Sequence, residues 1–117
     1  MEVHINKKIL TLVKILEEKQ AVETKILDVR NITWITDYFI ITSAQSSVQA
    51  KALLDSIIEN FDEKPLSIEG TSSSNWILID FQDIIIHIFL SEARLFYNLE
   101  KLWADAREIK ITEEKIL

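Results

Sequence analysis

Residues 76–89 read WILIDFQDIIIHIF, and this stretch decides the fold of the chain. Two apolar runs, Trp76–Ile79 and Ile84–Phe89, flank the short polar segment Asp80–Asp83. Runs of β-branched and aromatic residues on either side of a four-residue segment are typical of a β-hairpin. We therefore expect two antiparallel strands here, followed by a helix that Ser91 caps.

Side-chain alternation divides the predicted hairpin into two faces. The turn is expected at residues 81–82, so that Asp80 lies opposite Asp83. Trp76 then lies opposite His87. One face is purely aliphatic and belongs to the core: Ile77, Ile79, Ile84, Ile86 and Ile88. The other face is mixed: Trp76, Leu78, Ile85, His87 and Phe89. It is either a partly exposed binding surface or a surface under a helix, with His87 as a buried imidazole.

The rest of the chain predicts helices and strands that alternate around this hairpin. Apolar residues recur at helical spacing in three segments: 5–19, 50–61 and 93–103. Short β-branched runs predict three further strands: 25–29, 38–42 and 66–69. The expected fold is a single α/β domain with a mixed β-sheet flanked by helices. The pattern gives no position for the tail at 109–117.

The composition indicates one globular domain over residues 1–117. Hydrophobic residues make up 48% of the chain, which favours a packed core over disorder. The chain has no cysteine, so disulfides, thiolate zinc sites and a thiol nucleophile are excluded. A single glycine and a single proline exclude glycine-rich phosphate-binding loops of the Walker and Rossmann types.

The charge balance is acidic, with a formal net charge of −6. Binding to nucleic acid without sequence preference needs Lys and Arg side chains against phosphates, so this balance disfavours it. A basic protein partner fits better, because charge complementarity speeds association, although acidity of this size also serves solubility alone. Neither a leader nor a membrane-spanning apolar run is visible, which predicts a cytosolic protein, or an organellar one after removal of a leader.

Few side chains are arranged for chemistry. Asp80 and Asp83 could hold Mg²⁺ at the turn, but such residues more often bond nearby backbone as turn formers. The serines at 72–74 have no base nearby in sequence, and no two histidines stand at metal-ligand spacing. We therefore expect no catalytic residue, no metal and no cofactor.

The last predicted helix offers polar residues on its solvated face: Arg94, Asn98, Lys101 and Asp105. Tyr97 lies beside the apolar stripe of the same helix. It either packs at the edge of the core with its hydroxyl in water or contacts a partner at the rim of an interface.

Five segments occur in the order and spacing of a known family. They are TDYFII (36–41), Ser46-Ser47 with Lys51-Ala52, Glu69-Gly70, the hairpin at 76–89, and Arg94 with Phe96-Tyr97 and LEKLW (99–103). Together they resemble the ribosomal silencing factor RsfS, or Iojap-like, family over about residues 26–106.

The resemblance implies a nucleotidyltransferase-like fold without the nucleotidyltransferase active site, and a protein that is not an enzyme. It further implies binding to the large ribosomal subunit through its fourteenth protein, on the intersubunit face. A factor bound there blocks joining of the small subunit and represses translation. Mitochondrial relatives assist assembly of the large subunit, which is one alternative function; a nucleotidyltransferase-like enzyme is another. The resemblance is also compatible with a homodimer.

Trp76 matches the family's partner-contact tryptophan, and the resemblance gives it that role here. We predict interface roles for six further motif positions: Glu69, Asp80, Asp83, His87, Arg94 and Tyr97. Gln82 is a departure, because the family usually has glycine within the hairpin turn.

Overall fold

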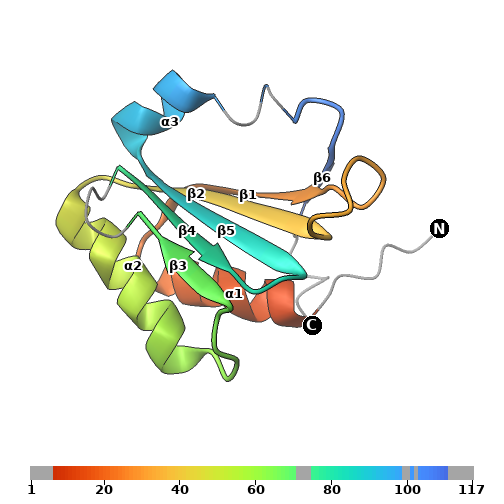
Figure 1. Cartoon of the computed structure of the whole chain (residues 1–117). Helices are drawn as coiled ribbons and strands as arrows, with labels where there is room; N and C mark the ends of the chain where they lie inside the picture. The colour runs from red at the N-terminus through yellow and green to blue at the C-terminus, as the bar shows by residue number, and fades with distance from the viewer. Residues whose placement is uncertain (1–6, 71–74, 99–100, 102, 111–117) are drawn as a thin grey trace.

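The computed structural model describes residues 7–70, 75–98, 101 and 103–110, and for residues 95–97 it describes the backbone alone. Helices and strands alternate largely as the sequence predicts (Figure 1). They are α1 (Lys7–Glu18), β1 (Val22–Asp28), β2 (Tyr38–Ala44), α2 (Ser47–Asn60), β3 (Ser67–Glu69), β4 (Trp76–Asp80), β5 (Ile84–Leu90), α3 (Ser91–Tyr97) and β6 (Arg107–Ile109).

The described strands form one mixed six-stranded sheet in the order β3-β4-β5-β2-β1-β6. β2 and β5 are parallel neighbours at its centre, and the other pairings are antiparallel. Every residue of β2, and every residue of β5 except the last, is buried. Strands covered on both faces are expected to be almost continuously apolar, which explains the three consecutive isoleucines that begin β5.

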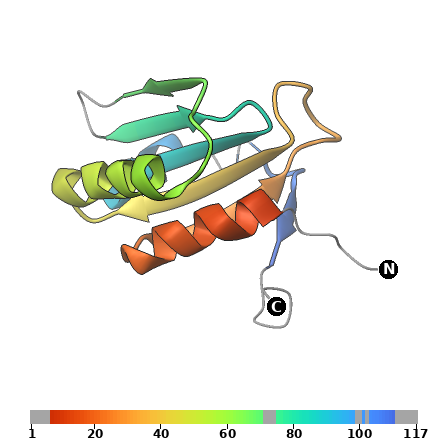
Figure 2. The same cartoon turned by 90° about the horizontal axis from the view of Figure 1, so that it is seen from below.

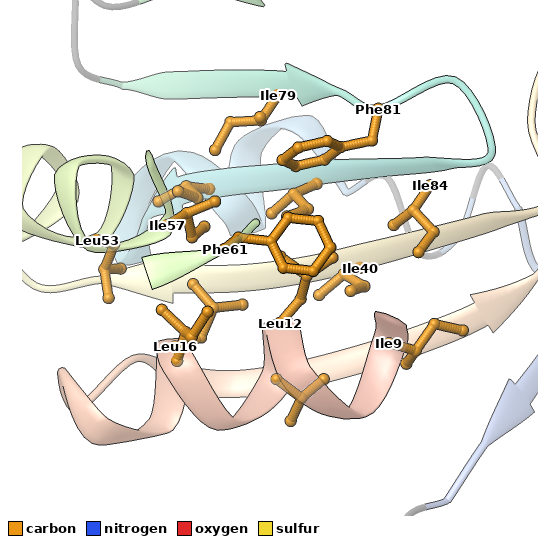
Figure 3. Packing of buried hydrophobic residues seen from close by; sticks show 14 of the residues in the cluster. Ile9, Leu12, Leu16, Ile40, Leu53, Ile57, Phe61, Ile79, Phe81 and Ile84 are labelled. Carbon is orange, nitrogen blue, oxygen red and sulfur yellow. The ribbon is translucent and has the colours of Figure 1, made fainter. Parts of the chain in front are cut away.

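Helices α1 and α2 cover one face of the sheet, and α3 lies on the other (Figures 1 and 2). The core between the sheet and the two long helices is aliphatic apart from three aromatic residues, Tyr38, Phe61 and Phe81. Figure 3 shows the rings of Phe61 and Phe81 among the aliphatic side chains. The isoleucine face of the hairpin is confirmed, because each of its five residues is at most 1% exposed: Ile77, Ile79, Ile84, Ile86 and Ile88. Ser46 caps the start of α2, since its Oγ accepts the Gln49 N–H at 3.1 Å, a role for which serine is a preferred residue.

The hairpin turn lies one residue later than the sequence predicts. Its central residues are Gln82 and Asp83, so that Trp76 pairs with Phe89 and Asp80 with Ile85. The Phe81 N–H donates to the Ile84 carbonyl at 2.9 Å. The expected pairings of Asp80 with Asp83 and of Trp76 with His87 are therefore wrong, although the division into two faces is unchanged. This register buries the Phe81 ring edge-on against Phe61, at 5.2 Å between centroids.

Gln82 adopts a left-handed backbone conformation, with φ of +79°. The first central position of a two-residue hairpin turn favours glycine in this conformation, because a Cβ atom is crowded there. We expect Gln82→Gly to raise the free energy of unfolding by about 1 kcal/mol. Chemical denaturation of the two proteins measures the difference. Gln45→Gly, at an exposed loop residue without a positive φ, should be neutral or destabilising.

The segment after β5 differs most from expectation. Ser91 does not cap α3; its hydroxyl instead donates to the Ala44 carbonyl at 3.3 Å, and Leu90 is the N-cap residue. The predicted helix at 93–103 is interrupted, because α3 ends at Tyr97 and Asn98 takes a left-handed conformation with φ of 47°, while Lys101 is again helical. Residues 99, 100 and 102 of that prediction lie outside the described residues. The chain then returns to the sheet, where β6 pairs with β1.

Candidate partner interface

The part of the sheet around β3 and β4 presents a partly exposed surface on the face opposite α1 and α2. On β4, burial alternates, with Trp76, Leu78 and Asp80 partly exposed. Register places Glu69 of β3 opposite Leu78, and residues paired in this way share a face. We call these four residues, Glu69, Trp76, Leu78 and Asp80, the β3–β4 face. It combines two apolar side chains with two carboxylates.

A second apolar cluster forms the floor beside the β3–β4 face. Its buried members are Leu27, Val29, Phe39, Ile41, Ile85 and Phe89. Trp76, Leu78, Ala93, Trp103 and Ala106 pack against this cluster as its partly buried rim. Ala93, Trp103 and Ala106 thus cover part of the mixed hairpin face, while its β4 edge stays partly open. Both alternatives for the mixed face are therefore partly correct: one part of it is covered, with His87 buried, and the other part is partly exposed.

Trp76 lies flat against this floor. Its ring stacks on Phe89, with 4.9 Å between ring centroids and 27° between the planes. Its indole Nε1 donates a hydrogen bond to Nδ1 of His87 at 3.1 Å. A tryptophan held in this way presents a large apolar area at low entropic cost, which is what a binding anchor requires.

His87 is buried beneath Trp76 and is only 4% exposed. Phe39 meets its ring edge-on at 4.9 Å. Burial lowers the pKa of His87 to about 4, so the imidazole is neutral near pH 7. The sequence predicted His87 as an interface residue, but at this depth the side chain supports the surface and is not part of it.

The two aspartates of the turn are separated. Asp80 Oδ1 accepts the Gln82 N–H at 2.7 Å, the backbone contact that is typical of a turn-forming aspartate. Asp83 meets the ammonium of Lys8 at 2.9 Å, and the same ammonium meets Glu63 at 2.9 Å. Burial by itself would lower the pKa of Lys8, but the hydrogen bonds and ion pairs with Asp83 and Glu63 raise this pKa overall. Asp80 therefore belongs to the β3–β4 face, while Asp83 is tied to α1.

Arg94 does not lie on a solvated face and is 7% exposed. Its guanidinium donates to the Glu23 carbonyl at 2.7 Å and to Ser43 Oγ at 2.8 Å. Glu23 has φ of 52° and lies where the β1–β2 register shifts, so Arg94 bonds the backbone of a bulge. The prediction that it is solvated is wrong, because α3 packs flat on the sheet. The side chain of Tyr97 lies outside the described residues.

Two features escaped the sequence analysis. Leu78 completes the β3–β4 face, although it was predicted only as a member of the mixed hairpin face. Trp34, in the loop between β1 and β2, is 94% exposed, and the neighbouring Ile35 is 61% exposed. No pattern in the sequence distinguishes a solvated tryptophan in a loop from a buried one.

The arrangement is suited to binding. Among the described residues, no group of three or more histidine, cysteine, aspartate or glutamate side chains could hold a metal ion. In the same residues, no helix is long and apolar enough to cross a membrane. An anchored tryptophan flanked by carboxylates matches a protein surface that carries positive charge. The fold and this face define a small α/β domain whose partly exposed surface has the composition of a protein-binding site.

Comparison with known proteins identifies its family. The model of the family described as "RsfS: Ribosomal silencing factor during starvation" matches residues 2–116. The chain belongs to this family, as the sequence motifs predicted.

Individual relatives agree with this assignment. Ribosomal silencing factor RsfS of Bacillus subtilis is 36% identical over 93 residues, which cover 77% of this chain and 79% of the relative. The protein named mitochondrial assembly of ribosomal large subunit protein 1, from Mus musculus, is 32% identical over 79% of this chain and 43% of its own length. A crystal structure of a Chromobacterium violaceum protein superposes with a TM-score of 0.79 and 26% identity, covering 89% of this chain and 88% of the other.

Proposed function

We propose that this protein binds the large ribosomal subunit through the β3–β4 face and sterically blocks joining of the small subunit, which represses translation. The observation that carries the proposal is the anchored Trp76 with carboxylates beside it, in a chain of the silencing-factor family. Steric blocking needs a rigid body and a docking surface but no chemistry. We place this action in the cytosol, among the ribosomes.

The proposed docking partner is a basic ribosomal protein on the intersubunit face, the fourteenth of the large subunit in the family to which the motifs point. Glu69 and Asp80 bring negative charge to the rim of the apolar anchor. The net charge of −6 also opposes close approach to ribosomal RNA. A basic ribosomal protein is therefore the favoured binding partner. Co-sedimentation with isolated large subunits tests binding, and its salt dependence tests the mode: a steep loss of affinity with salt would point to phosphate contacts instead.

The charge of the rim leads to a direct prediction. We expect Glu69→Lys to weaken binding to the large subunit about fivefold at low salt, mainly through slower association. The difference should shrink as ionic strength rises, because exposed charges are screened. Glu17→Lys on α1 makes the same change in net charge away from the β3–β4 face, and it should leave the affinity unchanged. Equal effects of the two variants would show that only overall charge matters.

A role in assembly of the large subunit is the second candidate, and the name of the mouse relative favours it. The two roles share the docking step and differ in timing. Accumulation of large-subunit precursors in cells without the protein would favour assembly, whereas excess joined ribosomes during starvation would favour silencing.

An enzymatic role of the nucleotidyltransferase type is the rival from another class. A titration of the protein with nucleotide and Mg²⁺ separates it from our proposal. We expect no saturable binding, and tight binding would contradict the steric mechanism.

A further inference from the structure

His87 occupies a position that an apolar side chain would fill more simply. It lies in the middle of β5, in the run IIIHIF, and is 4% exposed. Aromatic rings surround it, with Phe39 edge-on at 4.9 Å and Phe89 parallel at 6.3 Å. Its Nε2 is buried and has no hydrogen-bond partner among the described residues. A buried polar atom without a hydrogen-bond partner destabilises a fold. We therefore expect His87 to provide a benefit that offsets this loss of stability.

The other ring nitrogen shows where the benefit lies. Nδ1 of His87 accepts the hydrogen bond from Trp76 Nε1 at 3.1 Å. An imidazole that accepts at Nδ1 carries its proton at Nε2, and this assigns the tautomer from the bonding pattern. Leucine or phenylalanine at position 87 would fill the same space but leave the indole N–H without this acceptor.

Stacking alone leaves the indole free to slide and turn in its own plane. Phe89 fixes the plane of the Trp76 ring, and the bond to His87 fixes its direction within that plane. We propose that His87 is a positioning residue that holds the Trp76 indole in its docking orientation and does not touch the partner itself. The inference rests on the proposed docking role of the β3–β4 face, to which it adds His87 as the residue that orients Trp76.

The hydrogen bond can be tested in the isolated protein by NMR of ¹⁵N-labelled tryptophan side chains. Trp76→Phe identifies the Trp76 indole N–H signal among those of the three tryptophans. In His87→Leu we expect this signal to move upfield and its exchange with solvent to become faster, while the melting temperature stays at or above that of the wild type. His87→Asn keeps an acceptor near the Nδ1 position and should restore much of the shift. An unchanged indole signal in His87→Leu would overturn the proposal.

A double-mutant cycle on large-subunit binding tests the consequence. We expect His87→Leu to weaken binding about threefold to tenfold, the scale of one hydrogen bond. In the Trp76→Phe background, which lacks the indole N–H, the same change should alter the affinity less than about twofold. Additive losses would mean that His87 acts on the partner independently of Trp76, and they would overturn the proposal.

The two experiments separate this inference from the proposed function. If the wild-type protein does not bind large subunits, the proposed function fails, yet the NMR result still decides whether His87 orients Trp76. If the wild type binds and the cycle shows no coupling, the docking role stands and the positioning role fails.

Discussion

Replacing Trp76 with alanine should weaken binding to the isolated large ribosomal subunit about tenfold or more, which corresponds to at least 1–2 kcal/mol. The indole stacks on Phe89 and bonds to His87, so it is already ordered before the partner arrives. Binding therefore loses little side-chain entropy, and truncation removes most of the apolar contact. Co-sedimentation at increasing subunit concentration gives the change in affinity.

Truncation of Trp76 also removes contacts within the protein. We expect Trp76→Ala to lower the free energy of unfolding by about 2 kcal/mol, because the Phe89 ring loses its cover and His87 Nδ1 loses its donor. Circular dichroism must therefore show that the variant is folded under binding conditions. Trp34→Ala is the matched control, since it truncates a tryptophan that is 94% exposed and outside the β3–β4 face. A folded Trp76→Ala protein that binds like the wild type would refute the anchor role.

The second large effect is a loss of stability in acid through His87. Its pKa is about 4 in the folded protein against 6.5 as the ordinary value. The unfolded chain therefore binds a proton at a higher pH than the folded one does. The pH-dependent contribution of His87 to the free energy of unfolding is fully present above pH 6.5. It falls as the pH drops below 6.5 and is largely lost by pH 4. Between these limits the free energy of unfolding should decrease by about 3 kcal/mol from this group alone.

Urea denaturation at pH 6.5 and at pH 4 measures this effect, and His87→Leu is the control. The variant retains every other titrating group, so the difference between the two pH dependences isolates His87. We expect the variant to lose about 3 kcal/mol less than the wild type over the same range. Parallel pH profiles would show that the imidazole titrates normally and is not buried.

The faces of the hairpin were predictable, and its register was not. Strand periodicity assigns each side chain to a face by its parity alone, so Ile77 and Trp76 were separated correctly. Register depends on the turn, and here a left-handed Gln82 moves the centre by one residue. A glutamine gives no signal for that conformation, whereas a glycine would have given one.

Burial at the site depended on elements that the sequence predicts weakly. His87 and Arg94 were placed at the interface, but Trp76 lies over His87 and Arg94 is buried between α3 and the sheet. Trp103 and Ala106, between α3 and β6, pack against the same apolar cluster as Trp76. α3 is seven residues long and β6 three, which is too short for a periodic pattern to place them. The β4 part of the face was predictable, because Trp76 and Asp80 lie on a hairpin strand with a clear signal. Glu69 lies on a strand of only three residues, and only the family motif indicated it.

Subunit joining is the most direct test of the central claim. Isolated large and small ribosomal subunits are mixed at a Mg²⁺ concentration that permits joining, with and without an excess of the protein, and the joined fraction is followed by light scattering and sucrose gradients. We predict that the wild-type protein lowers the joined fraction and that Trp76→Ala does so much less. A wild-type protein that co-sediments with large subunits while joining proceeds to its full extent would contradict the account.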